Sequence, residues 1–442
     1  MNPDTPPFSA SSAAPGSGLS TTIPRVASPV TAAYPAFSGY GLEIEYMIVD
    51  AHTLQVRPLA GELLKAAAGG GEPADVDRGN GMGWSNELAL HVFEIKNQRP
   101  LADLGALAAA FQGEALAAND LLAPLGCRLM PGGMHPWMDP VREARLWDRE
   151  PAGLYQAYDR IFDCHRHGWA NVQSVHLNLP FGNDLEFARL HAAIRLVLPL
   201  LPALAASSPL AEGRVSGYLD YRLEVYRTHQ MKVPTTQGEV IPDNSASPAD
   251  YETRVLQPMY REIAPHDPEG LLQSEWLNAR GAIPRFGRNA IEIRVLDVQE
   301  CPQADCAIAA LATALIRRLY EAGAAWLARH GDLPTPLLAG IFKACSQDAE
   351  AARVDDPGYL ALLGFDSRPR PAGEIWAALL DELAAAGRLT TPWIDPLATI
   401  VRHGPLARRI LAAAGPDPSR ERLQEVYQEL CRCLAEGRMF RA

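Results

Sequence analysis

The segment GLEIEYMIVD, from Gly41 to Asp50, decides the fold class because apolar and acidic residues alternate along it. Successive side chains of a β-strand point to opposite faces, so Glu43 and Glu45 share one face. The opposite face carries Leu42, Ile44, Tyr46 and Ile48. The segment therefore predicts a strand with one apolar face and two neighbouring carboxylates on the other.

Two further segments repeat this pattern. The segment QSVHLNL, residues 173–179, places His176 and Asn178 on one face, and AIEIRVLD, residues 290–297, places Glu292 and Arg294 together. A sheet with one solvated face would explain any single strand. The three strands together favour a site, because adjacent carboxylates repel each other unless a cation lies between them. Mg²⁺ prefers oxygen ligands and leaves positions for water and phosphate, so this face suits a metal–nucleotide complex.

A fourth segment, residues 86–97, adds Glu87 and Glu94. Their spacing of seven is odd, so a regular strand would aim them at opposite faces. Both can reach one site only if a bulge intervenes or if Glu87 lies in the loop before the strand. His91, in the same segment, is predicted to be a structural imidazole rather than a ligand.

The chain divides into three predicted regions. Residues 1–38 are rich in Ser, Ala, Pro, Thr and Gly and are predicted to be a disordered tail. Residues 39–330 mix short alternating runs with Ala- and Leu-rich stretches, which predicts an α+β catalytic domain. Residues 331–442 are predicted to be a helical C-terminal region without strands. The clearest helical stretches are 101–122, 185–207, 302–329, 372–386 and 418–436.

Composition excludes several functional classes. Among 442 residues there are 40 Lys and Arg against 52 Asp and Glu, a net charge of −12 that disfavours binding to nucleic acid. No apolar run of about 18 residues predicts a membrane span, and the start does not resemble a secretory signal. The seven cysteines lack C-x-x-C spacing, which favours reduced thiols over structural zinc. We expect a soluble, cytoplasmic protein without a membrane partner, and the sequence leaves a homo-oligomer open.

The ordered set Glu43-x-Glu45, Glu87 with Glu94, His176-x-Asn178 and Glu292-x-Arg294 resembles the glutamate–cysteine ligase family. The resemblance runs from about residue 39 to 320. The segments LMPGGMHP at 129–136 and PTTQG at 234–238 are similar to its bacterial carboxylate–amine ligase branch, whereas VHLNLP at 175–180 looks more like the other bacterial branch. The resemblance implies a curved antiparallel sheet that forms a funnel with outer helices, of the glutamine synthetase and guanido kinase type.

The resemblance also implies roles for named residues. Two or three Mg²⁺ ions that hold the ATP phosphates would be bound by Glu43, Glu45, Glu87, Glu94, His176 and Glu292. Arg294 would contact the transferred phosphoryl group or a substrate carboxylate, for which its planar fork is suited. Arg280 and Arg285 are candidates for the same catalytic work or for surface ion pairs. Lys232 lies in a segment punctuated by Pro and Gly and is a candidate cofactor-binding residue on a closing loop.

The implied activity is an ATP-dependent ligation. The family phosphorylates a carboxylate with ATP, and an amine then attacks the acyl phosphate, so we expect a γ-glutamyl amide of cysteine or of another amine. The alternatives are a ligase for a specialised amine or peptide and a non-catalytic relative that binds metal and nucleotide. A metal-dependent hydrolase that uses Glu94 and His176 is a third, and it lacks the two or three His ligands expected for zinc. The expected partners are a small-molecule acid and amine.

Overall fold

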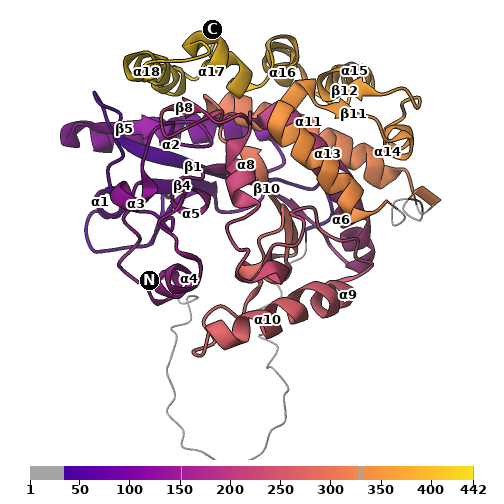
Figure 1. Ribbon diagram of the computed structural model, residues 1–442, viewed down its shortest axis with the longest axis horizontal. Helices are drawn as coiled ribbons and strands as arrows, with labels where there is room; N and C mark the ends of the chain where they lie inside the picture. Colours follow the sequence, from indigo (N-terminus) through magenta and orange to yellow (C-terminus); the bar gives the residue numbers. More distant parts are fainter. Residues whose placement is uncertain (1–33, 151, 324, 327–328, 330–332, 442) are drawn as a thin grey trace, which may run out of the picture. The chain divides into compact units, whose positions relative to one another are not determined.

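One antiparallel sheet of eight strands lies at the centre of the computed structural model, which describes residues 34–150, 152–323, 325–326, 329 and 333–441 (Figure 1). The strand order is β2-β3-β4-β1-β6-β10-β9, and β5 also pairs with β1. The strands are β1 Gly41–Asp50, β2 Asp75–Asp77, β3 Met82–Asn86, β4 Val92–Asn97, β5 Cys127–Met130, β6 Ser174–Pro180, β9 Ala282–Arg285 and β10 Ala290–Asp297. The predicted antiparallel sheet is therefore confirmed, and β1 and β10 have the predicted bounds.

The apolar face of the sheet is covered by long helices. The side chains of Leu42, Ile44 and Tyr46 are fully buried, as the alternation in this strand predicts. They share one core with the apolar sides of α2 Leu104–Leu122, α6 Asp184–Val197 and α11 Pro302–Glu321. Helix α11 packs against both α2 and α6. Burial of this face fixes which side of each strand carries the polar residues.

Two predicted helices are shorter than the sequence pattern suggested. The stretch 185–207 is broken into α6, a single 3-10 turn at Leu198–Leu200 and α7 Pro202–Ala205. Pro199 and Pro202 cause this break, because proline has no backbone N–H to continue the helix. Helix α11 ends at Glu321, two residues before Gly323, whose φ of 89° is incompatible with a right-handed helix.

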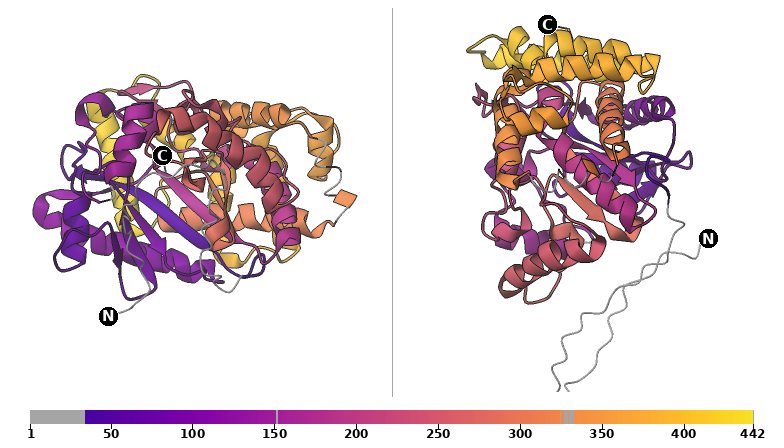
Figure 2. Two further views of the ribbon diagram at one scale, coloured as in Figure 1. Left: turned by 90° about the horizontal axis from the view of Figure 1, so that it is seen from below. Right: turned by 90° about the vertical axis from the view of Figure 1, so that its right-hand side faces the viewer.

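The C-terminal region is helical, as predicted (Figure 2), and its last two helices cover part of the second face of the sheet. Met47 and Val49 of β1 and Met130 of β5 share a core there with the last two helices. The helices are α13 Thr335–Asp348, α14 Pro357–Leu362, α15 Ala372–Ala385, α16 Thr391–His403, α17 Leu406–Ala414 and α18 Arg420–Glu436. The expectation of no strand in this region was wrong, because β11 Arg353–Val354 pairs with β12 Arg370–Pro371.

Shorter elements surround the sheet. They are α1 Ala60–Ala67, α3 Pro140–Glu143, α4 Ala152–Phe162, α5 His167–Ala170, β7 Leu210–Ala211, β8 Arg214–Val215, α8 Tyr221–Tyr226, α9 Pro248–Tyr251 and α10 Gln257–Ile263. None of the helices within the described ranges is long and apolar enough to cross a membrane. All seven cysteines are buried and unpaired.

Most of the predicted N-terminal tail, residues 1–33, lies outside the described residues. Residues 34–38 contact the body of the protein. The backbone N–H of Ala36 donates to Glu186 at 2.7 Å, and the Phe37 ring lies edge-on to Tyr320. The predicted boundary near residue 330 stays a prediction.

Candidate active site

The register of four neighbouring strands brings the predicted polar residues to one face. Glu43 on β1 lies opposite Lys96 on β4 and opposite His176 on β6. Two residues further along β1, Glu45 lies opposite Glu94. Glu292 on β10 lies opposite Asn178, the next polar residue of β6. Segments far apart in the sequence thus contribute adjacent side chains because their alternation is in phase across the sheet.

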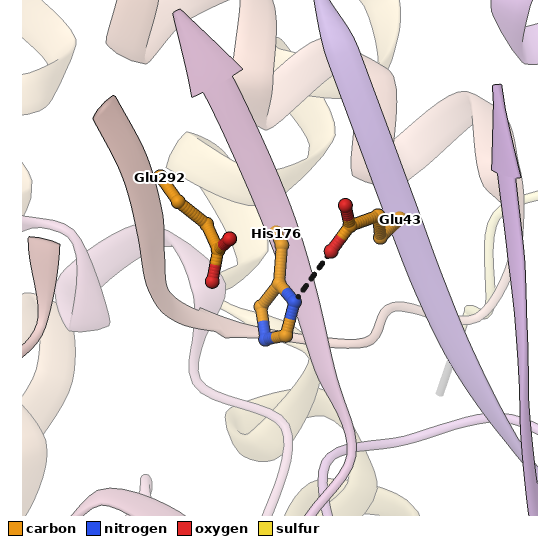
Figure 3. Close-up of side chains that lie close together, drawn as sticks. All are labelled: Glu43, His176 and Glu292. Atoms are coloured by element: carbon orange, nitrogen blue, oxygen red, sulfur yellow. Dashed lines mark hydrogen bonds and ion pairs between the residues drawn. The ribbon is translucent and has the colours of Figure 1, made fainter. Parts of the chain in front are cut away.

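Glu43, His176 and Glu292 converge from β1, β6 and β10 (Figure 3). One potential ligand atom from each residue lies within 4.8 Å of the other two. The Nδ1 atom of His176 lies 3.0 Å from a carboxylate oxygen of Glu43. Two carboxylates and an imidazole at this separation are a donor set that could hold one cation.

A second group of potential ligands shares the same histidine. Glu45, Glu94 and His176 also offer atoms within 4.8 Å of one another. The backbone N–H of Ser174 donates to Glu45 at 2.6 Å and so fixes that carboxylate. Burial lowers the pKa of His176, but the hydrogen bond to Glu43 and the charge of Glu45 outweigh it, so this pKa lies above its ordinary value.

Glu87 lies directly after β3, in the loop that leads to β4. This is the second of the two arrangements that its odd spacing from Glu94 allowed. Burial and the nearby charges of Glu45, Glu94 and Glu43 raise the pKa of Glu87 well above its usual range. Burial and the charge of Glu43 raise the pKa of Glu94 to about 7.

The clustered carboxylates fit the divalent cation that the sequence predicts. The raised pKa values of Glu87 and Glu94 show that these groups resist ionising together in this site. A cation bound among their oxygens would remove that cost, and an oxygen-rich donor set with one imidazole suits Mg²⁺.

Two arginines hold Glu292. The Nη2 atom of Arg294 donates to one oxygen of Glu292 at 2.6 Å, and the Nη1 atom of Arg285 donates to the other at 3.2 Å. The pairing of β10 with β6 shifts register between Ile293 and Leu296, so a bulge in β10 lies beside His176. Although burial raises the pKa of Glu292, the charges of Arg294 and Arg285 outweigh it and lower this pKa to about 2.

Arg280 and Lys232 lie apart from the carboxylates. The Nη1 atom of Arg280 donates to the backbone oxygen of Thr235 at 3.1 Å and to the side chain of Asn278 at 3.2 Å. Arg280 is buried and supports the loop around Thr235. The side chain of Lys232 is exposed, and neither residue is on the wall of the cavity described next.

The carboxylates and Arg294 line one side of a cavity of about 480 Å³. Aromatic side chains form another part of the lining, which the alternation along the strands does not predict. This part includes Tyr155, Tyr158, Trp169, Tyr226, His229 and Trp276. These residues come from α4, α5, the end of α8, the turn that follows it and the 3-10 turn Glu275–Leu277, so no periodic signal in the sequence connects them. His91 lies outside this lining, is buried, and has its pKa lowered by burial to about 4.

Proteins of other organisms are similar to this chain in sequence. A protein of Archaeoglobus fulgidus named "Uncharacterized protein" is 32% identical over 401 residues, which cover 90% of this chain and 99% of that protein. A Nocardioides sp. protein named "Putative glutamate-cysteine ligase 2-1" is 30% identical over 287 residues, which cover 64% of this chain and 68% of the relative.

Solved structures share the fold at low sequence identity. The glutamate-cysteine ligase of Francisella tularensis in complex with AMP superimposes with a TM-score of 0.60 at 13% identity and covers 90% of this chain and 88% of its own. A bifunctional glutathione synthetase from Pasteurella multocida gives 0.54 at 14% identity and covers 90% and 52%. The model of glutamate-cysteine ligase family 2 matches residues 40–429, a range that includes every carboxylate of the site. The chain therefore belongs to glutamate-cysteine ligase family 2, whose members are ligases.

Proposed function

We propose that the protein is an ATP- and Mg²⁺-dependent ligase that joins the side-chain carboxylate of glutamate, or of a similar acid, to an amine through an acyl phosphate. The observation that carries the proposal is the cluster of Glu43, Glu45, Glu94 and Glu292 around His176, in one cavity with Arg294. Family membership supports the same reaction class. The expected relation to the glutamine synthetase fold belongs to the proposal, and the antiparallel sheet with one acidic face supports it.

Phosphoryl transfer needs positioned charge more than it needs a covalent nucleophile. Glu43, Glu45, Glu87, Glu94, His176 and Glu292 would hold two or three Mg²⁺ ions, which supply charge neutralisation for the ATP phosphates. Glu292 also keeps Arg294 at the cavity wall, where its guanidinium can contact a phosphoryl oxygen or a substrate carboxylate. Arg285 lies behind Glu292 and stacks on the Trp276 ring at 3.2 Å, so it positions the carboxylate and the ring together.

Arg280 and Lys232, the two remaining candidates, lie outside the cavity lining, so the roles proposed for them differ from that of Arg294. Arg280 would act by holding the loop of residues 234–238, to whose backbone it donates. Lys232 lies just before this loop, and its exposed side chain is outside the cavity lining, so it would contact a bound nucleotide only if this part of the chain moves toward the cavity.

The test is ADP release by the purified protein with ATP and Mg²⁺, with glutamate and other acids screened against a panel of amines that includes cysteine. Product mass is measured in parallel. We expect release that depends on one acid–amine pair, with a product lighter than that pair by one water.

The alternatives give different results in the same assay. A specialised amine or peptide acceptor would show ADP release with an acid but no product with the simple amines. A non-catalytic relative would bind Mg²⁺ and ATP without releasing ADP. Failure to bind nucleotide at all would reject the ligase proposal.

Size-exclusion chromatography of the same sample tests whether the protein is a homo-oligomer.

A further inference from the structure

His229 follows α8 by three residues and lies on the wall of the cavity. Its ring stacks on Tyr226 with centroids 4.4 Å apart and meets Trp169 edge-on at 4.6 Å. The indole N–H of Trp169 donates to the backbone oxygen of His229 at 3.3 Å. Gly168 permits this approach, because a Cβ at that position would lie 2.7 Å from the Cβ of His229. These neighbours hold the imidazole in one orientation.

The hydrogen bonds of His229 define its tautomer. Its Nδ1 atom is hydrogen-bonded to the backbone oxygen of Tyr226. A carbonyl oxygen can only accept, so Nδ1 carries the proton and Nε2 keeps a lone pair. Within the described part of the chain Nε2 has no hydrogen-bond partner, and it is not one of the fully buried polar atoms. The lone pair of Nε2 is therefore available to a molecule in the cavity.

The surroundings keep this imidazole neutral. Burial lowers the pKa of His229 to about 4, against the effect of the hydrogen bond to Tyr226. The charge of Arg294 contributes to this lowering. The same guanidinium binds Glu292, so His229 lies near the carboxylate cluster. The phenol of Tyr226 and the amide of Gln237 also lie close to its ring.

We infer that His229 is the base that takes the proton from the attacking amine, an inference that rests on the proposed ligase activity. Amide formation from a neutral amine requires the nitrogen to lose one proton. As the nitrogen–carbon bond forms, the bond from the acyl carbon to the phosphate oxygen breaks, and its electron pair leaves with the phosphate. The nitrogen proton passes to Nε2 of His229 and then to the departing phosphate, so the products are the amide and hydrogen phosphate.

A weakly basic imidazole suits this step. The nitrogen becomes cationic as it bonds to carbon, which makes its proton far more acidic than in the free amine. A base that is neutral at pH 7 has its lone pair free in nearly every molecule. Its low pKa reduces the driving force for taking the proton, and the acidity of the cationic nitrogen offsets this loss. The rings of Trp169 and Tyr226 cover part of the imidazole beside the cavity.

The test compares two nucleophiles in the full-length protein with ATP, Mg²⁺ and glutamate. The first nucleophile, cysteine or the amine that the ADP-release screen selects, needs a base to remove a proton from its nitrogen. Hydroxylamine is a weakly basic, strongly nucleophilic probe that traps acyl phosphates without one. His229→Asn keeps a donor near the Nδ1 position and removes Nε2. We expect amide formation to fall about 10²- to 10⁴-fold, the usual contribution of a general base, with hydroxamate formation little changed.

A second variant tests the role chemically. His229→Ala should regain amide formation when imidazole is added, because the free base can occupy the vacated space. His165→Asn is the matched control, since His165 pairs with Asp159 away from the cavity lining. This control should leave both products unchanged.

The outcomes separate this inference from the proposed function. Equal losses of amide and hydroxamate in His229→Asn would show a structural role, and unchanged amide formation would show no role, so either result overturns the inference while the ligase activity stands. If the unmodified protein forms neither product nor ADP with any acid, the proposed function fails and this inference is rejected with it.

Discussion

At the scale of single residues, the carboxylates of the site differ in what supports them. Glu43 is hydrogen-bonded to His176, and its negative charge raises the pKa of both Glu87 and Glu94. Glu292 is instead neutralised by Arg285 and Arg294. Substitution of the two residues by glutamine should therefore affect stability in opposite ways.

Glu43→Gln should abolish turnover and leave the metal-free protein as stable as before or more stable. The amide removes one of several repelling charges and can still accept from His176. We expect Mg²⁺ affinity to fall at least about 100-fold, because even residues outside the ligand shell contribute 10- to 100-fold. Thermal unfolding with and without Mg²⁺ and ATP measures this, together with ADP release. The exposed Glu374→Gln is the control, and full activity of Glu43→Gln would contradict the assignment.

Glu292→Gln should destabilise the fold as well as remove activity. Glu292 is 2% exposed, and the substitution removes a counter-charge from the partly buried Arg294 and from the buried Arg285, which keeps only Glu275. Removing one partner of a buried pair costs about 3–5 kcal/mol. Urea unfolding gives the free-energy change, and the double variant with Arg285→Gln should recover part of the loss. Wild-type stability of Glu292→Gln alone would show that the arginines do not depend on this carboxylate.

The acidic half of the cavity was predictable, and the aromatic half was not. Period-2 alternation defines the face of Glu43 and Glu292 whatever their partners are. His229 and Trp169 reach the cavity from a turn and a four-residue helix, whose positions depend on tertiary packing. Arg280 follows the family pattern, and Lys232 was chosen for the Pro and Gly residues of its segment. Side-chain direction in a loop has no periodic rule, and the structure places both outside the cavity lining.

At the scale of elements, long strands were predictable and short ones were not. β1 and β10 each show several cycles of alternation, so their bounds follow from the sequence. β11 and β12 have two residues each, which is too short for any period, and they form because Arg353 and Val354 meet Pro371 and Arg370 in space. Pro199 and Pro202 indicate a break in the helix, but the helical composition on both sides of them favoured one continuous helix over 185–207.

Helix α18 offers a test of how the C-terminal region is coupled to the sheet. Leu430 is fully buried in the core that joins this helix to Met47 and Met130. Leu430→Ala should cost about 2–5 kcal/mol, the usual result for a leucine deletion in a core. We expect a single urea transition shifted to lower concentration, because the helix covers a strand that also carries Glu43 and Glu45.

The exposed Leu185→Ala is the control for this substitution and should change stability by less than about 0.5 kcal/mol. Two separate transitions in Leu430→Ala would contradict the coupling. They would instead support the boundary predicted near residue 330, with the helical region unfolding by itself.

At the scale of the whole molecule, buried titratable groups change the free energy of unfolding in opposite directions as the pH falls. His135 and His191 are fully buried, and burial lowers the pKa of each to about 3. Both bind a proton in the unfolded chain below about pH 6.5 but not in the folded protein, so each makes the fold less stable as pH falls. Glu94, with its pKa raised to about 7, binds its proton first in the folded state and stabilises the fold over part of the same range. The pH dependence of the wild type alone therefore does not identify any one group.

A variant of His191 isolates one of these contributions. Its ring lies against Phe187 and Tyr251, and neither ring nitrogen has a hydrogen-bond partner among the described residues. His191→Leu removes the titration without opening a large cavity. Between pH 7 and pH 5 the free energy of unfolding of this variant should fall by about 2 kcal/mol less than that of the wild type. Urea unfolding at both pH values measures the difference, and equal falls would mean that His191 is protonated in the folded protein, which would require water to reach this part of the core.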